Sequence, residues 1–406
     1  MKLIVTILIL LIVDYYFYSA ISTILNNYIL KIIYWLISFS FYLAILYIFL
    51  NYYEQDYSVE SGNNLIICTS LILIIFVSKF LGIVPLIIDD IIRSFKLLNI
   101  FLFKIDTHYN VDRLKFLKQT AVIISSLLFS TMLLGMKFGR YNFKKNFQDI
   151  YLKKWPKSLN GYKIIHISDL HLGSFGSVEK LEEVVKIINE EVADLIVFTG
   201  DLVNNSFHEA TAYINTLNKL IAKDGKFSVL GNHDYGDYRG IKRGTKVWEE
   251  NFQNLKNLEK DAGFQLLLNE TITINRSEDK FNLIGVENWG AGNFNKDGDI
   301  DSAITNIDQS LPNILLSHDP SHWSQVILKK NYNIDLQLSG HTHGMQFGVD
   351  IPGIKWSPVQ YRYKQWAGLY RKDQKQIYVN RGLGSLGYAG RVGIMPDISI
   401  LNIRSV

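Results

Sequence analysis

Long apolar runs separated by short polar stretches fill the first third of the chain. Each run has about the 20 residues that an α-helix needs to cross the hydrocarbon layer of a membrane. The runs predict transmembrane helices over about residues 3–22, 29–50, 65–88 and 120–136. The first contains Asp14 and the third contains Lys79. Because a charge in lipid is costly, we expect these two side chains to pair, to face a polar cavity or to reach the membrane surface.

The orientation of these helices is set by the positive charges that flank them. Lys2 and the first apolar run resemble a signal peptide, but Tyr18 stands where cleavage needs a small side chain, so we predict a retained helix. With the amino terminus inside, eight Lys and Arg residues flank the helices on the cytoplasmic side and six lie in the loop Asp89 to Gln119. This small excess favours a multi-pass protein of the cell membrane with its carboxyl-terminal part in the cytoplasm. The loop itself is expected either to lie on anionic headgroups or to be a solvated connector.

From residue 162 onwards, short β-rich runs alternate with amphipathic segments that have the period of a helix. Strands are predicted over residues 163–168, 195–199, 227–230, 281–286, 313–316, 335–338, 376–379 and 398–402, with helices near 178–192 and 210–222. This alternation is typical of βαβ units around a mostly parallel sheet. We therefore predict an α/β domain over residues 161–406, joined to the transmembrane region (1–136) by a basic juxtamembrane linker over residues 137–160.

Composition narrows the class of protein. A single cysteine, Cys68, excludes a disulfide scaffold and a Cys-rich zinc module, and 48% hydrophobic residues exclude a disordered chain. The formal charge of +4 comes entirely from residues 1–150, because residues 151–406 contain 29 basic and 29 acidic side chains. Since that half is neutral, we expect no nucleic-acid partner that binds by charge neutralisation.

Polar clusters follow five of the predicted strands. They are Asp169-Leu-His171, Gly200-Asp201, Gly231-Asn232-His233-Asp234, Ser317-His318-Asp319-Pro320 and Gly340-His341-Thr342-His343-Gly344. Ligand sites in open α/β sheets gather at the carboxyl ends of strands, so these clusters are expected to meet in one crevice. Any one of them alone would be an ordinary loop, but all five at strand ends predict a functional site.

The residue types in these clusters suit metal ions. Carboxylates, neutral imidazoles and one amide oxygen are ligands for divalent first-row ions, and the absence of thiolates argues against a structural zinc site. Two ions about 3.5–4 Å apart would polarise a phosphoryl oxygen and lower the pKa of a bound water, so that hydroxide is available as nucleophile at neutral pH. The clusters thus favour a dinuclear centre, with eight metal–ligand bonds if Asp201 bridges the ions.

The same motifs resemble those of the calcineurin-like metallophosphoesterase superfamily, over about residues 160–406. Residues 160–164, 341–344 and 380–384 are similar to its membrane-associated bacterial branch, which includes YkuE-like phosphoesterases and a class of UDP-2,3-diacylglucosamine pyrophosphatases. The resemblance implies a four-layer α/β/β/α sandwich, which here would follow an all-α region of four transmembrane helices. It also implies a bacterial cell membrane as the location.

The resemblance assigns roles to individual residues. It implies that one ion is held by Asp169, His171 and His343, the other by Asn232, His318 and His341, with Asp201 shared. The ions would be manganese, iron, zinc or a similar metal. His233 falls at the position of the catalytic imidazole, which assists the leaving group, and Asp234 would orient it. Met345 stands where this branch usually has a second glycine, which calls the shape of the pocket rim into question.

Three further features have two interpretations each. Arg391, in a Gly-rich loop, and Tyr235, beside the expected site, are candidate substrate contacts, although a solvent-facing arginine and an ordinary loop tyrosine fit as well. Residues 351–366 interleave Trp and Tyr with Lys and Arg, which favours an interfacial loop that docks on the membrane or encloses a lipid tail. A packed structural loop is the alternative.

Taken together, these features predict a membrane-anchored metal-dependent phosphoesterase. It would hydrolyse a phosphate ester or pyrophosphate by attack of a metal-bridging hydroxide, with His233 assisting the leaving group. A phosphorylated lipid or lipid-linked molecule is the expected substrate, since a tethered enzyme meets a membrane-bound substrate at high effective concentration. Two other classes stay open: a non-catalytic membrane sensor or adaptor that retained the fold, and a small transporter with a regulatory domain.

Overall fold

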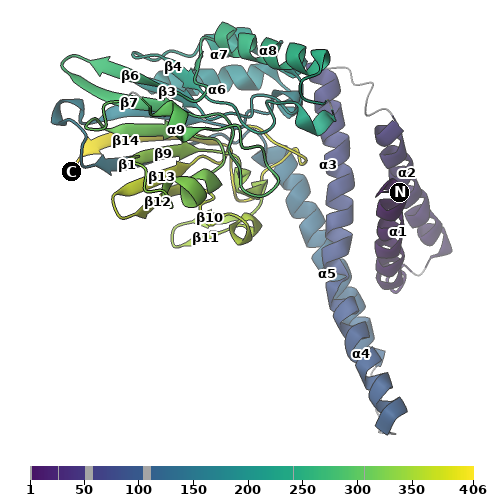
Figure 1. The fold of residues 1–406 in the computed structure, drawn as a ribbon. Helices are drawn as coiled ribbons and strands as arrows, with labels where there is room; N and C mark the ends of the chain where they lie inside the picture. Colours follow the sequence, from purple (N-terminus) through teal and green to yellow (C-terminus); the bar gives the residue numbers. More distant parts are fainter. Residues whose placement is uncertain (1, 26, 51–57, 104–110, 241, 306) are drawn as a thin grey trace. The chain divides into compact units, whose positions relative to one another are not determined.

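The computed structural model describes residues 2–25, 27–50, 58–103, 111–240, 242–305 and 307–406 (Figure 1). The chain divides into two compact units. One, the helical unit, comprises residues 1–55 and 67–135, and the other, the α/β unit, comprises residues 56–66 and 136–406. Each unit is described by itself.

Within the residues described, five helices form the amino-terminal part of the chain. They are α1 (Lys2–Ile21), α2 (Tyr28–Leu50), α3 (Val59–Gly82), α4 (Val84–Phe103) and α5 (Val111–Leu134). Three helical segments are long and apolar enough to cross a membrane, Tyr28–Ile48, Val59–Phe103 and Asp112–Gly139, and Val5–Ile21 is a shorter apolar helix. Many of their large apolar side chains are exposed, as expected where lipid is the solvent.

The expected connector between Asp89 and Gln119 was wrong, because most of it is helical. Helix α4 continues to Phe103 and α5 begins at Val111, and residues 104–110 lie outside the described part of the chain. Asp89 accounts for the difference: its carboxylate pairs with Arg93 one turn later at 3.0 Å and with Arg113 of α5. Opposite charges spaced by four residues stabilise a helix, as Asp89 and Arg93 do here, and the pair of Asp89 with Arg113 joins α4 to α5.

The predicted pair of intramembrane charges is confirmed. Lys79 Nζ lies 2.5 Å from Asp14 Oδ1. The hydroxyl of Tyr42 donates to Asp14 Oδ2 at 3.0 Å, and that of Tyr34 donates to Asp14 Oδ1. Asp14 is fully buried, so its charge is compensated within the helical unit.

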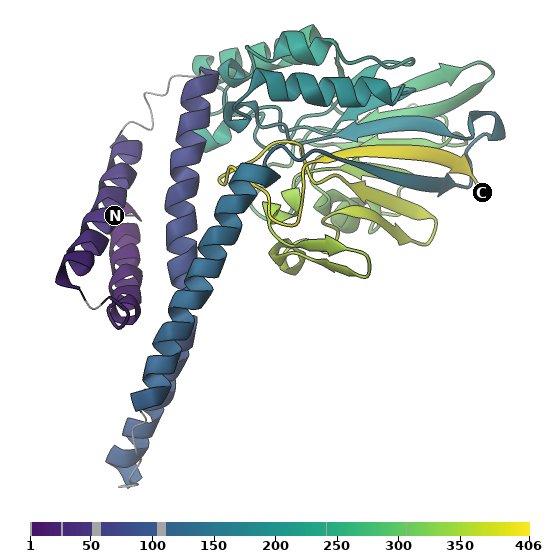
Figure 2. The ribbon, with the colours of Figure 1, turned by 180° about the vertical axis from the view of Figure 1, so that it is seen from behind.

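Two six-stranded sheets make up the core of the α/β unit (Figures 1 and 2). In spatial order the first consists of β1 (Lys144–Leu152), β14 (Asp397–Ser405), β2 (Tyr162–Ile167), β3 (Leu195–Phe198), β4 (Lys226–Ser228) and β5 (Gln265–Leu266). The second consists of β12 (Gly368–Lys372), β13 (Lys375–Val379), β9 (Leu336–Ser339), β8 (Asn313–Leu316), β7 (Asp279–Gly285) and β6 (Glu270–Arg276). A separate hairpin pairs β10 (Val349–Ile351) with β11 (Ile354–Trp356).

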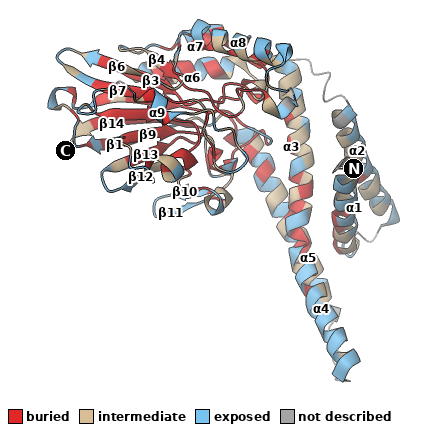
Figure 3. Ribbon diagram, viewed as in Figure 1, coloured by how far each residue is buried: buried red, intermediate tan, exposed pale blue. Residues whose placement is uncertain are grey.

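The sheets pack face to face and are covered on both sides, which confirms the predicted α/β/β/α sandwich. Buried side chains of β2, β3, β7 and β8, among them Ile164, Phe281 and Leu316, fill the space between the sheets. Helices α6 (Val178–Glu190), α7 (Ile214–Asn218) and α8 (Lys246–Asp261) cover the first sheet, and α9 (Ile300–Ala303) with the turn around Trp323 covers the second. Burial is accordingly densest along the central strands (Figure 3).

The structure differs from the sequence prediction at the edges of the sheets. Residues 137–160, expected to be a linker, contain β1, which pairs in parallel with β14 over nine residues. Only Ile150 and Leu152 of β1 are fully buried, so the strand lacks the apolar signature of a core strand. The sheets are also mixed, because β14, β6 and β12 each have an antiparallel neighbour.

We predict that Ile164→Ala lowers the free energy of unfolding of the α/β unit by about 2–5 kcal/mol, because it opens a cavity between the sheets. Urea unfolding of the detergent-solubilised chain, followed by tryptophan emission, measures the change. Ile221→Ala is the matched control: Ile221 is 69% exposed, so the change should stay within about 0.5 kcal/mol. Equal effects of the two variants would contradict the proposed inter-sheet core.

Candidate metal centre

The seven predicted ligands lie directly after five strands of the two sheets. Asp169 and His171 follow β2, Asp201 follows β3, Asn232 follows β4, His318 follows β8, and His341 and His343 follow β9. Five of the seven have a left-handed backbone, with φ between 46° and 70°: Asp169, His171, Asp201, His341 and His343. Such conformations cost about 1–2 kcal/mol for residues with a Cβ, and they concentrate where structure is held for function.

Two glycines allow the loops to approach this closely. A Cβ on Gly231 would collide with the Asp201 carboxylate, and a Cβ on Gly340 would collide with Ser168 and Asp169. Any other residue at either position would therefore push a carboxylate out of place. This explains why glycine accompanies the polar residues in these motifs.

The structure gathers the acidic and imidazole side chains into two groups. In the first, Asp169, His171 and His343 are all buried. His171 Nε2 lies 3.0 Å from His343 Nε2, and His343 Nε2 lies 3.2 Å from Asp169 Oδ1. Three ligand atoms thus converge on one point.

The second group consists of Asp201, His318 and His341, with Asn232 beside them. His341 Nδ1 lies 2.8 Å from Asn232 Oδ1 and 3.3 Å from His318 Nε2. Asp201 connects the two groups: its Oδ2 is 3.2 Å from His318 Nε2 and 3.5 Å from His171 Nε2. This carboxylate therefore stands where a bridging ligand would.

Hydrogen bonds on the far side of each ring fix which nitrogen faces the centre. His318 Nδ1 donates to the Thr199 carbonyl at 2.6 Å. In the neutral ring Nε2 therefore carries no hydrogen, and its lone pair points at Asp201. His171 Nδ1 likewise donates to Asn204 Oδ1 at 3.1 Å. Lone pairs that face a carboxylate repel it unless a proton or a cation lies between them.

His341 is held in the opposite tautomer by residues that the sequence did not single out for this purpose. Its Nε2 is 2.8 Å from the hydroxyl of Tyr363, which is 3.2 Å from Asp319 Oδ2. Donation from Nε2 to Tyr363, and from Tyr363 to Asp319, leaves Nδ1 free to face His318 and Asn232. Tyr363 lies 22 residues after His341 at no recognisable spacing, so only the fold brings it here.

The protonation equilibria of these histidines fit a cation site. Burial lowers the pKa of His171 to about 3, which keeps its imidazole in the neutral, ligating form. Burial also opposes protonation of His318, but the adjacent Asp201 carboxylate raises the pKa of His318 to about 10. The position between these two side chains thus attracts positive charge, and a divalent ion would occupy it in place of a proton. The donor set therefore fits metal ions.

His233 lies beside the two groups and contacts Asp201 through its backbone. Its N–H donates to Asp201 Oδ1 at 2.9 Å, and its ring is half-buried, 4.4 Å from the ring of Tyr238 between centroids. Nδ1 donates to the Asn204 carbonyl at 2.7 Å, so Nε2 is the nitrogen available for chemistry. The hydroxyl of Tyr238, which accepts from Asn232 at 2.8 Å, was not among the predicted site residues.

Asp234 does not orient His233, contrary to the expectation from the sequence. Its buried carboxylate accepts the backbone N–H groups of Gly231, Asp201 and Leu202, each at 2.8 Å. Asp234 thus ties the loop after β4 to the loop after β3, while the Asn204 carbonyl holds the His233 ring. Burial, together with the nearby Asp201, raises the pKa of Asp234 to about 7.

The two expected substrate contacts are both buried and bonded to other residues of the chain, and Arg391 Nη2 lies 3.5 Å from Nδ1 of the ligand His343. Arg391 is fully buried and donates to the carbonyl oxygens of His343, Arg381, Gly382 and Gly384. Its role is to fix the loop that follows β13. Tyr235 is buried as well, and its hydroxyl donates to Glu287 at 3.2 Å. Both side chains are consumed by internal bonds, which the sequence could not reveal.

Comparisons with known proteins agree with this geometry. A family model described as "Calcineurin-like phosphoesterase" matches residues 162–345. A second, described as "Probable Calcineurin-like phosphoesterase, transmembrane domain", matches residues 1–140. The chain belongs to the calcineurin-like phosphoesterase family, as the resemblance of its motifs implied.

Three relatives indicate the branch. The chain is 33% identical to the metallophosphoesterase YkuE of Bacillus subtilis over 253 residues, which cover 62% of this chain and 82% of YkuE. It is 29% identical over 280 residues to the UDP-2,3-diacylglucosamine pyrophosphatase LpxG of Chlamydia muridarum, and the match covers 58% of this chain and 82% of LpxG. It is 28% identical over 243 residues to the phosphodiesterase YaeI of Escherichia coli, and the match covers 60% of this chain and 82% of YaeI.

These findings define the class of the protein. It is a metal-dependent phosphoester hydrolase with a membrane domain, and its fold implies divalent metal ions. Hydrolases among its relatives favour this class over the sensor and the transporter.

Met345, at the position where a glycine was expected, tests whether the left-handed backbone there lowers the stability of the protein. Its φ is +54° and its side chain is 58% exposed, so it carries the backbone cost without the compensation of burial. We predict that Met345→Gly raises the free energy of unfolding by about 1 kcal/mol, because glycine adopts this conformation freely. Urea unfolding provides the measurement.

Met345→Ala is the control for that variant. It shortens the side chain but keeps the Cβ, so its stability should stay close to that of the wild type. If alanine stabilised the protein as much as glycine, side-chain exposure and not backbone strain would be the cause.

Proposed function

We propose that this protein hydrolyses phosphate esters or pyrophosphates at a centre of two divalent metal ions. Asp169, His171 and His343 would hold one ion, Asn232, His318 and His341 the other, and Asp201 both. The observation that carries the proposal is the position of Asp201 Oδ2, which lies within 3.5 Å of ring nitrogens from both groups. Manganese, iron and zinc all suit these ligands.

The side chains around the centre suggest how the reaction proceeds. When bound, the ions supply Lewis-acid polarisation of the phosphoryl group and activation of the attacking water. His233 Nε2, the nitrogen left free by the bond from Nδ1 to Asn204, would in its protonated form give a proton to the departing oxygen. The bond from the His233 N–H to Asp201 keeps this residue beside the proposed bridging ligand.

A lipid or lipid-linked phosphoester is the proposed substrate. The relative LpxG is named for a pyrophosphatase activity on a diacylated sugar nucleotide. In this chain the β10–β11 hairpin and its flanks expose apolar side chains, namely Met345, Val349, Ile351, Ile354, Trp356 and Tyr361, which are 37–81% exposed. Exposed apolar side chains gathered in this way mark interaction sites.

Charge around the hairpin is suited to a membrane surface. Residues 345–372 contain five Lys or Arg and one Asp, a net charge of +4 (5 − 1), although residues 151–406 as a whole are neutral. Arg362, Lys364, Arg371 and Lys372 are exposed. Cations beside exposed aromatic and aliphatic side chains favour anionic headgroups. The hairpin is also tied to the centre, because Ser357 donates to the Gly344 carbonyl at 2.8 Å.

The proposed location is a bacterial cell membrane with the α/β unit in the cytoplasm. The relatives reported above are bacterial, and the Lys and Arg count favours this orientation. A reporter that is active in only one compartment, fused after Val406, checks the orientation directly.

Hydrolysis of two model diesters tests the proposed reaction. Full-length protein in detergent with Mn²⁺ is expected to hydrolyse bis-p-nitrophenyl phosphate and to lose this activity when a chelator removes the metal. His233→Ala should lower kcat by about 10²–10⁴ for a diester with an alkoxide leaving group, which needs a proton. The loss should be much smaller for p-nitrophenolate, which leaves without one.

His208→Ala, a change at an exposed histidine outside the centre, is the control and should leave both rates unchanged. Equal losses for the two leaving groups in His233→Ala would rule out the acid role of His233. Absence of any metal-dependent hydrolysis would refute the proposed function itself.

A negative charge introduced into the β10–β11 hairpin tests whether the substrate is a lipid. Ile354→Glu is expected to lower the hydrolysis of a phosphoester presented in vesicles containing phosphatidylglycerol by about tenfold, because docking loses apolar contact and gains repulsion. Hydrolysis of soluble bis-p-nitrophenyl phosphate should change less than twofold. Ile221→Glu places the same charge at an equally exposed isoleucine of the same unit and should affect neither substrate. If Ile354→Glu leaves the vesicle rate intact, the hairpin does not serve lipid access.

A further inference from the structure

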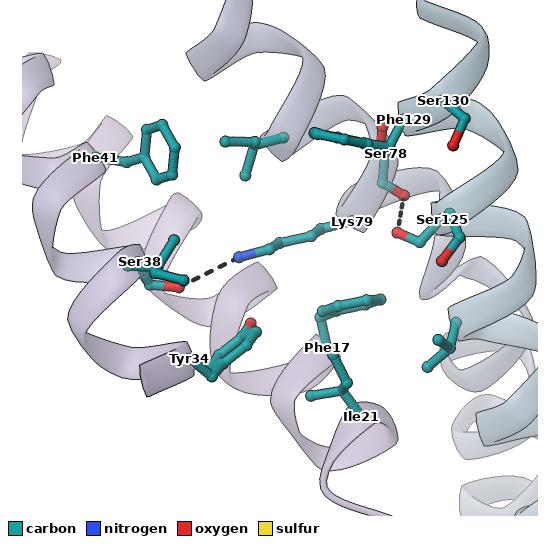
Figure 4. Close-up of a pocket in the computed structure, with 14 residues that line it drawn as sticks. Phe17, Ile21, Tyr34, Ser38, Phe41, Ser78, Lys79, Ser125, Phe129 and Ser130 are labelled. Carbon is teal, nitrogen blue, oxygen red and sulfur yellow. Dashed lines mark hydrogen bonds between the residues drawn. The ribbon is translucent and has the colours of Figure 1, made fainter. Parts of the chain in front are cut away.

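A cavity lies within the helical unit, among helices α1, α2, α3 and α5 (Figure 4). Its volume is about 540 Å³, within the range of pockets that hold small organic ligands. One part of its wall is apolar and includes Phe17, Phe41 and Phe129. Serine is common where membrane helices pack, so the significance of the cavity rests on its charged group and its unpartnered group.

The surface of the cavity is mainly apolar, but polar side chains also contribute to it. Of the fourteen lining residues seven carry polar side chains: Tyr34, Ser38, Ser78, Lys79, Ser125, Ser126 and Ser130. None of the fourteen is acidic. Polar groups are costly in a hydrocarbon environment unless they are hydrogen-bonded, and in membrane-spanning helices they mark functional sites.

Lys79 reaches across the cavity with donor capacity to spare. Figure 4 shows its side chain extending from α3 toward Ser38 of α2. Its ammonium group bonds to Asp14 at 2.5 Å and to Ser38 Oγ at 3.3 Å. Since an ammonium group has three hydrogens, one remains beyond these two bonds, and the Asp14 carboxylate also accepts from the hydroxyls of Tyr34 and Tyr42.

Ser78 supplies an independent sign of a ligand. It is 2% exposed, and its Oγ has no hydrogen-bond partner within the described residues. Its carbonyl accepts from Ser125 at 2.6 Å, so the two serines lie side by side on the same wall as Lys79 (Figure 4). A buried hydroxyl without a partner costs about 1–3 kcal/mol, which a bound acceptor would recover.

We propose that this cavity binds the oxygen-rich head of a membrane amphiphile, with ester or phosphodiester oxygens that accept from Lys79 Nζ and Ser78 Oγ and an apolar chain against the phenylalanines. The hydrogen of Lys79 that neither Asp14 nor Ser38 accepts, together with the lack of a lining carboxylate, selects an oxygen-bearing ligand and disfavours a cation. The mixed wall selects an amphiphile and disfavours a free anion. The helical unit then has a binding function of its own, separate from the metal centre.

Photolabelling in a bilayer tests this proposal. The probe is a phosphatidylglycerol with a diazirine in its acyl chain, and full-length protein is held in nanodiscs of phosphatidylethanolamine and phosphatidylglycerol. We expect label in the α3 and α5 peptides that line the cavity. Ser126→Phe, which fills the cavity, should lower that label at least about fivefold, equivalent to about 1 kcal/mol of binding. Ser40→Phe, at an exposed serine of α2 outside the cavity, should not.

Competition separates the two possible sources of oxygen ligands. Excess dihexanoylphosphatidylglycerol should displace the probe and inorganic phosphate should not. Displacement by phosphate would show that the cavity binds a free anion and not an amphiphile. Equal labelling of wild type and Ser126→Phe would show that the label comes from bulk lipid. Either result overturns the proposal.

A second variant tests the polar contact. The double change Asp14→Leu with Lys79→Met removes the ion pair without leaving a lone buried charge, and it should lower labelling as well. Monodisperse elution and an unchanged melting temperature establish that the variants fold. If the double variant does not fold, the comparison of Ser126→Phe with Ser40→Phe still decides the proposal.

Discussion

Lone pairs that face one another within 3.5 Å dominate the centre of the α/β unit. Ring nitrogens of His171 and His318 both point at Asp201, and hydrogen bonds on their far sides prevent them from turning away. Such an arrangement is unfavourable without positive charge between the atoms. Much else in the unit serves to maintain it: the left-handed backbone at five ligands, the glycines that permit close approach, and the buried carboxylate of Asp234 that ties two loops together.

The sequence was informative about the side chains at the centre because they recur at the ends of strands in short motifs. It gave no role at the centre to Tyr363, which appeared only within the segment 351–366, or to Asn204. These two residues fix the histidine tautomers from loops with no characteristic spacing. It also suggested the wrong roles for Asp234, Arg391 and Tyr235. Polar residues near a site look alike in sequence, and only the hydrogen bonds distinguish a side chain that meets the substrate from one that supports a loop.

Central strands were predictable since their side chains are buried on both faces and read as apolar runs. The edge strand β1 was missed because few of its side chains are buried, and helix α4 was missed because charged residues interrupt its apolar pattern. In β1 the pairing with β14 is the deciding contact, and in α4 the pairs of Asp89 are. Lys79 and Asp14 could be paired from the sequence alone, because few other partners exist for a charge in lipid.

The stoichiometry of bound metal tests the central claim most directly. Elemental analysis of the purified full-length protein, after dialysis against metal-free buffer, should find two divalent ions per chain, and Asp201→Asn should retain at most one. Asp194→Asn, a change at a carboxylate that pairs with Lys223 at 2.8 Å away from the centre, should retain both. A wild-type chain without bound metal, or an Asp201→Asn variant that keeps two ions, would contradict a shared dinuclear centre.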